Sequence, residues 1–191
     1  MIRAFIAVDL DDPVVEKICN TIGVLKSRIT EIRWLKKENL HLTLKFLGNI
    51  AEPQVESIVA AIGQPLRLFA PCTISAKGLG VFPDFRRPKI LWVGLSGGPL
   101  ADLAAKIESA LAPLGFVPEN RVFTPHLTIG RWREGSRPAK NLRQEIASWN
   151  DFEFGACAVR QIVLFQSVLK PEGASYRELR TIQLGAELAG D

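Results

Sequence analysis

Several patterns are scarce in this chain of 191 residues, and each scarcity excludes a class of protein. No segment reaches the roughly 18 consecutive apolar residues that a membrane-spanning helix needs, so no membrane partner is expected. The three cysteines are scattered and odd in number, without a CxxC pair. That usage argues against a disulfide framework or a zinc site, and it predicts a cytoplasmic protein. Residues 1–9 become acidic too early for a secretory signal and predict a strand.

Charge and composition exclude little more. The chain is 47% hydrophobic and 23% charged, as in ordinary globular proteins. Its formal net charge of +4 suits an anionic partner such as RNA, and it fits an ordinary basic cytoplasmic protein equally well.

The first half of the sequence predicts the order strand, helix, strand, helix. Residues 2–9 are mostly apolar, and acidic residues followed by Pro13 mark the start of a helix over 13–28. Residues 39–47 alternate strictly between apolar and polar side chains, which is typical of a half-buried strand. A second helix is expected after Pro53.

The second half repeats this order. Strand 89–95 precedes a helix from Leu100 to Leu111, and an alternating strand around His126 precedes a short closing helix. The distance from Ile2 to His41 is 39 residues, and that from Ile90 to His126 is 36. The similar order and spacing indicate an internal repeat.

These patterns predict one bilobal domain over 1–191, with repeats at 1–82 and 89–184. Further strands are expected at 72–82, 158–169 and 176–184, the last two joined by a turn at 171–173. The expected fold is α+β, with two pseudo-symmetric lobes that each hold a mainly antiparallel sheet and outer helices. Such lobes would place the two histidine strands on either side of a central cleft.

The chain has only two histidines, and both are followed by Leu-Thr. His41 precedes Leu42-Thr43, and His126 precedes Leu127-Thr128. A single histidine on a strand most often has a structural role, but the same two residues follow both by chance only about once in a hundred cases at typical residue frequencies. A duplicated packing motif is the structural alternative.

The alternation of a strand puts each histidine and its threonine on one face, about 6.6–6.8 Å apart. At neutral pH one imidazole can act as a base and the other, protonated, as an acid. The hydroxyls of Thr43 and Thr128 can donate hydrogen bonds to the non-bridging oxygens of a phosphate. His41 and His126 are therefore the candidate catalytic pair, and Thr43 and Thr128 are candidate phosphate ligands.

Metal binding is the rival interpretation of the pair. Two histidines without clustered cysteines or carboxylates leave a coordination sphere unfilled. No metal or other cofactor is therefore expected.

With their flanks, the paired motifs resemble the two-histidine phosphoesterase superfamily, in particular its RNA 2′,3′-cyclic phosphodiesterase branch, also called 2′-5′ RNA ligase or LigT-like. The resemblance extends over essentially the whole chain. Its segments are Arg3–Ala7, Arg33-Trp34, Asn39–Gly48, Phe123–Arg131, Ser167 and Tyr176–Leu179.

This resemblance implies metal-independent hydrolysis of RNA 2′,3′-cyclic phosphate ends to 2′-phosphomonoesters, with ATP-independent 2′-5′ ligation as an associated reaction. It implies His41 as proton donor and His126 as proton acceptor, although the two motifs are too alike to assign these roles. RNA ends, such as those of tRNA fragments, are the expected partner, and a monomer is the default state. Two alternatives stay open: a phosphodiesterase acting on small cyclic nucleotides or 2′-5′ oligoadenylates, and a non-catalytic module that binds RNA ends.

Three residues near the motifs have two interpretations each. Similar proteins often place an arginine near the phosphate where Arg131 stands, but strict alternation puts Arg131 on the face opposite His126, and only a bulge at Gly130 would bring it round. Lys45 has the parity to extend the positive field, and it also fits a surface position. Trp92 lies inside an apolar strand, which favours a place in the core over stacking on a base.

Overall fold

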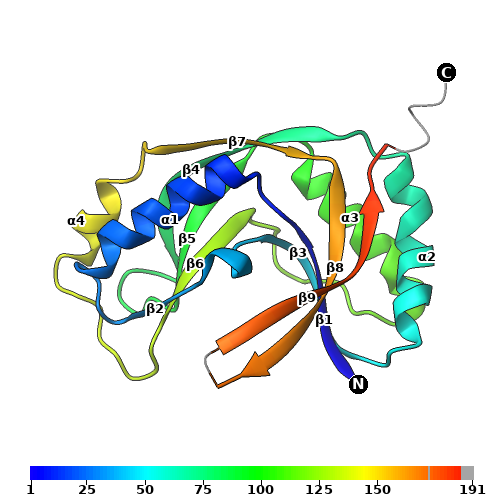
Figure 1. Cartoon of the computed structure of the whole chain (residues 1–191), viewed down its shortest axis with the longest axis horizontal. Helices are drawn as coiled ribbons and strands as arrows, with labels where there is room; N and C mark the ends of the chain where they lie inside the picture. Colours follow the sequence, from blue (N-terminus) through cyan, green and yellow to red (C-terminus); the bar gives the residue numbers. More distant parts are fainter. Residues whose placement is uncertain (172, 186–191) are drawn as a thin grey trace.

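The computed structural model describes residues 1–171 and 173–185 (Figure 1). Its strands are β1 (Ile2–Val8), β2 (Ile32–Trp34), β3 (Leu42–Ile50), β4 (Cys72–Phe82), β5 (Ile90–Ser96), β6 (His126–Trp132), β7 (Glu153–Val159), β8 (Gln161–Lys170) and β9 (Gly173–Gln183). Its helices are α1 (Asp12–Lys26), α2 (Gln54–Arg67), α3 (Leu100–Leu111) and α4 (Leu142–Ala147), with 3-10 turns η1 (Lys37–Asn39) and η2 (Ala112–Leu114). Among the described residues, no helix is both long and apolar enough to cross a bilayer.

The strands form one curled antiparallel sheet in the order β7-β4-β5-β6-β3-β1-β8-β9, with β2 beside β6. Its two halves join at β3 and β6, whose register contains the single pair Leu42 and Leu127. The expected α+β class with mainly antiparallel strands is confirmed, and the two half-sheets are continuous through this central pair.

The two lobes do not coincide with the two halves of the sequence. Helices α2 and α3 pack on the half-sheet of β3, β1, β8 and β9, whereas α1 and α4 pack on the half-sheet of β6, β5, β4 and β7 (Figure 1). Each lobe therefore combines elements from both repeats, so that neither repeat forms a lobe alone.

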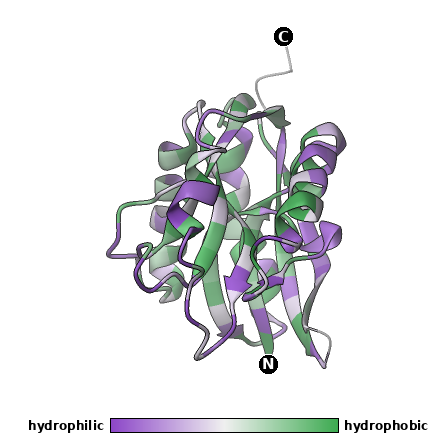
Figure 2. Ribbon diagram, turned by 90° about the vertical axis from the view of Figure 1, so that its left-hand side faces the viewer, coloured by the Kyte–Doolittle hydropathy of each residue, from purple (hydrophilic) through white to green (hydrophobic). Residues whose placement is uncertain are grey.

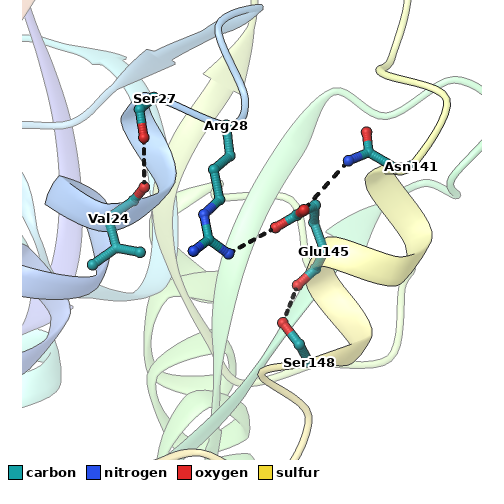
Figure 3. Close-up of polar contacts among 6 residues, drawn as sticks. All are labelled: Val24, Ser27, Arg28, Asn141, Glu145 and Ser148. Atoms are coloured by element: carbon teal, nitrogen blue, oxygen red, sulfur yellow. Dashed lines mark hydrogen bonds and ion pairs between the residues drawn. The ribbon is translucent and has the colours of Figure 1, made fainter.

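Contacts between α1 and α4 illustrate this interleaving (Figure 3). Arg28, just after α1, forms an ion pair with Glu145 of α4, with 3.2 Å between Nη1 and Oε2. Asn141 Nδ2 donates a hydrogen bond to the other carboxylate oxygen of Glu145 at 3.3 Å. Because an exposed pair of this kind contributes only about 0–1 kcal/mol, it orients the two helices more than it stabilises them.

The core follows the periodicities of the sequence, with apolar residues gathered on the strands and on the inner faces of the helices (Figure 2). In α1, the buried residues Val14, Ile18, Ile22 and Leu25 recur at helical spacing. Burying one such side chain contributes about 1.5–3 kcal/mol.

Two local expectations are wrong. The apolar segment 158–169 does not form one strand, because the chain breaks at Arg160 and passes from β7, beside β4, to β8, beside β1. Residues 39–41 do not belong to a strand either, since η1 ends at Asn39 and β3 begins at Leu42. Glu172, in the turn expected before β9, lies outside the described residues.

Candidate active site

The central strands bring the two His-Leu-Thr motifs side by side. Leu42 and Leu127 are opposite each other and fully buried, so their neighbours point to the other, concave face of the sheet. When this antiparallel register is continued by one residue on each side, Thr43 falls across from His126 and Thr128 across from His41. The two imidazoles and two hydroxyls thus lie together on one face.

Aromatic rings surround His41 from the β1 side. Its ring stacks on Phe5 with 4.8 Å between centroids, and Tyr176 meets it edge-on at 5.0 Å. Phe165 of β8 lies next to Phe5, at 5.4 Å. These rings fix the orientation of the imidazole and exclude much of the water around it.

This environment lowers the pKa of His41 from 6.5 to about 4. The largest cause is burial, which disfavours the charged ring. A hydrogen bond to the backbone of Asn39 acts in the opposite direction, and the positive charge of Arg131 lowers the pKa further. Without a bound anion, His41 is therefore neutral at physiological pH.

The lowered pKa predicts a loss of stability in acid. Between pH 6.5 and about 4 the unfolded chain protonates His41 while the folded chain does not, so the free energy of unfolding falls as the pH falls through this window. Urea denaturation from neutral pH to about pH 4 should show a larger loss for the wild type than for His41→Gln, by up to about 3 kcal/mol. Parallel curves for the two proteins would contradict the lowered pKa.

His126 has a different environment on β6. Its Nδ1 lies 2.7 Å from the carbonyl oxygen of Thr124. A carbonyl can only accept, so Nδ1 carries the proton and Nε2 holds the lone pair in the neutral ring. Phe82 meets the His126 ring edge-on at 5.0 Å, and Trp92 lies at 6.4 Å.

Trp92 therefore lines the site beside His126, in addition to packing within the sheet. Its ring extends over Gly80, where an added Cβ would lie 2.1 Å from the indole. An apolar strand predicts burial in the sheet but not the face on which each ring lies. That Phe5, Phe82 and Tyr176 line the site was not predicted from the sequence, because the histidines that they contact are distant along the chain.

The two threonines occupy matching positions in their half-sheets. Thr43 lies opposite Ala7 of β1, and Thr128 lies opposite Trp92 of β5. Both are half-buried. Their hydroxyls belong to the same face as the histidines, as the alternation predicts.

Arg131 also lies on this face, because β6 contains a bulge. Thr128 pairs with Trp92, but Gly130 pairs with Leu91, which leaves Ile129 as the extra residue. Arg131 then falls opposite Ile90, which shares a face with Trp92. The bulge lies at Ile129, one residue before the position considered from the sequence, and it places Arg131 on the same face as His126 and Thr128. The charge of Arg131 acts on both His41 and Tyr176.

A second bulge turns Lys45 away from the site. Thr43 pairs with Ala7 and Lys45 with Ile6, so Leu44 is the extra residue and Lys45 faces the opposite side. The lysine is 3% exposed. Its Nζ lies 2.5 Å from Glu108 Oε2 and donates a hydrogen bond to the Val117 carbonyl at 3.1 Å. Both positions considered for Lys45 from the sequence, the site and the surface, are therefore wrong.

No group of three or more His, Cys, Asp or Glu side chains within residues 1–171 and 173–185 is arranged to hold a metal ion. The two motifs and Arg131 contribute two imidazoles, two hydroxyls and a guanidinium to the concave face. These groups can move protons and bind an anion.

A model of the LigT-like phosphoesterases matches the chain twice in succession, over residues 8–92 and 93–176. The chain belongs to this family, which confirms the resemblance of its motifs. The RNA 2′,3′-cyclic phosphodiesterase of Methanothermobacter thermautotrophicus is 34% identical over 96% of this chain and 99% of its own. The enzyme of the same name from Aquifex aeolicus is 36% identical over 80% of this chain and 82% of its own.

Solved structures share the fold. The protein TT0787 of Thermus thermophilus superposes with a TM-score of 0.81 at 24% identity, covering 97% of this chain and 99% of its own. E. coli LigT complexed with 3′-AMP superposes with a TM-score of 0.75 at 25% identity, covering 96% of this chain and 98% of its own.

Proposed function

We propose that this protein hydrolyses the 2′,3′-cyclic phosphate at RNA ends to a 2′-phosphomonoester, without a metal ion. The observation that supports this most directly is that His41 and His126 flank the paired residues Leu42 and Leu127 and lie on one face of the central strands. Relatives over nearly the full length are RNA 2′,3′-cyclic phosphodiesterases. The partner is RNA with a cyclic phosphate end, tRNA fragments included.

In the proposed reaction, His126 is the base. Its Nδ1 proton is held by the Thr124 carbonyl, which leaves the lone pair of Nε2 to accept a proton from water. The water oxygen attacks phosphorus as the bond to the 3′ oxygen breaks. His41 donates a proton to that leaving oxygen, and the two rings return to their starting states by exchange with solvent.

The low pKa of His41 is compatible with its role as the acid once substrate is bound. A phosphate anion between the rings offsets the positive charge of Arg131 and so favours the protonated imidazole. A ring whose pKa is low by burial also gives its proton up readily. Thr43, Thr128 and Arg131 donate hydrogen bonds to the non-bridging oxygens, where negative charge accumulates.

Every residue in this proposal comes from one chain, so the enzyme is proposed to act as a monomer. Cys19, Cys72 and Cys157 are unpaired, and we place the reaction in the reducing cytoplasm.

The test is phosphorus NMR of a dinucleotide with a 2′,3′-cyclic phosphate end, treated with the protein in excess EDTA. The expected product is the 2′-phosphomonoester. Binding without turnover would favour a non-catalytic RNA-end module, and turnover that requires added metal would exclude the two-histidine mechanism.

A further inference from the structure

Three polar residues without a role in the proposed reaction lie in one row across neighbouring strands. Arg3 of β1 pairs with Ser167 of β8, and Ser167 pairs with Tyr176 of β9. Directly opposed residues of antiparallel strands share a face. The sheet therefore collects a guanidinium and two hydroxyls that are far apart in the sequence.

This row lies on the same face of the sheet as the histidine site. Arg3 stands two residues before Phe5, which stacks on His41, and β1 is continuous between them. Tyr176, the chain's single tyrosine, meets His41 edge-on. Ser167 likewise stands two residues after Phe165, whose ring packs on Phe5.

The charges around Tyr176 favour an anion. Burial raises the pKa of the Tyr176 phenol, while Arg131 and Arg3 both act to lower it. The phenol thus lies within the field of both arginines, one beside the histidines and one in the row. Within the described part of the chain, Arg3 forms no ion pair.

We propose that Arg3, Ser167 and Tyr176 form a second anion-binding subsite, which holds the phosphodiester on the 5′ side of the nucleotide that bears the cyclic phosphate. This inference rests on the proposed function. Two residues along a strand are about 6.6–6.8 Å, so the row begins close to the histidine site, as adjacent phosphates of an extended RNA strand require. The guanidinium supplies charge, and the hydroxyls supply hydrogen bonds to non-bridging oxygens.

The subsite makes the enzyme prefer chains to single nucleotides. We expect wild-type kcat/KM to be higher on a cyclic-phosphate dinucleotide than on the corresponding nucleoside 2′,3′-cyclic phosphate. Arg3→Gln should lower kcat/KM on the dinucleotide about tenfold and leave the mononucleotide unchanged, because a lost charged hydrogen bond to phosphate has roughly this effect. The slope of log affinity against log salt should decrease by about 0.7 for one phosphate of a single strand.

Arg177→Gln is the matched control. It removes the same charge from the next residue of β9, which is exposed and pairs with Gln166, on the opposite face of the strand. It should leave both substrates unaffected. Tyr176→Phe, which keeps the ring on His41 but removes the hydroxyl, should lower dinucleotide turnover selectively.

A third substrate, the cyclic mononucleotide with a 5′-phosphate, distinguishes a subsite that binds a phosphodiester within an RNA chain from one that binds a terminal phosphate. If Arg3→Gln affects only this compound and not the dinucleotide, or if it affects every substrate equally, the diester subsite is wrong.

Failure of the proposed function has a different signature. If the wild type turns over no cyclic phosphate, the function fails, and the subsite is then tested by the Kd of a dinucleotide ending in a 2′-phosphate. Weaker binding by Arg3→Gln than by Arg177→Gln supports the subsite. Equal affinities overturn it.

Discussion

Replacing His126 with alanine is expected to lower kcat on a cyclic-phosphate dinucleotide by a factor of about 10² to 10⁴, the usual contribution of a general base. Without the imidazole, the attacking water loses the group proposed to accept its proton. His41→Ala should cause a loss of similar size, because the 3′ oxygen would then leave without a proton. The double variant should lose little more than either single one, since the two rings act as a unit.

Chemical rescue separates a catalytic role from a structural one. Imidazole added to His126→Ala can occupy the space of the lost ring and accept a proton, so it should restore part of the turnover. Thermal unfolding of both variants provides the folding control. Near-normal rates in both single variants would exclude the histidine mechanism.

The second large effect concerns stability and not catalysis. The Lys45 ammonium is almost completely buried, and its side chain is 2% exposed against 18% for its partner Glu108. Glu108→Leu leaves this charge without a counterion in a site from which water is largely excluded. We expect it to lower the free energy of unfolding by about 3–5 kcal/mol, measured by urea denaturation.

Two controls isolate the buried charge. The double variant Lys45→Met/Glu108→Leu removes both charges and should be close to the wild type in stability, because apolar replacements of a buried pair are often neutral or stabilising. Glu56→Gln breaks the exposed contact with Arg180 and should cost no more than about 1 kcal/mol. If Glu108→Leu is as mild as Glu56→Gln, the Lys45 pair does not stabilise the fold.

The contacts of Lys45 also connect parts of the chain that are distant in the sequence. Lys45 belongs to β3, which follows His41, while Glu108 and Val117 lie in α3 and in the segment that leads to β6. The lysine thus joins β3 to α3 and to the segment that precedes β6. Strict alternation would place Lys45 on the face of the histidines, but its side chain lies on the opposite face of the sheet and binds Glu108.

The sequence alone determined most of the strands and helices, the α+β class and the candidate pair, because these depend on local periodicity and on a motif that occurs twice. Only the tertiary structure decided which face Arg131 and Lys45 occupy. Each follows a bulge, and one extra residue in a strand exchanges its two faces. Whether a bulge forms depends on the partner strand, so alternation within β3 or β6 does not reveal it.

The interleaving of the repeats and the row of Arg3, Ser167 and Tyr176 were likewise decided by strand pairing. Segment 158–169 is apolar throughout, and nothing in its sequence indicates that it divides between two half-sheets. The histidines were identifiable because their chemistry is rare in this chain and their motif is local. The residues that surround them were not, because they become neighbours only when distant strands pair.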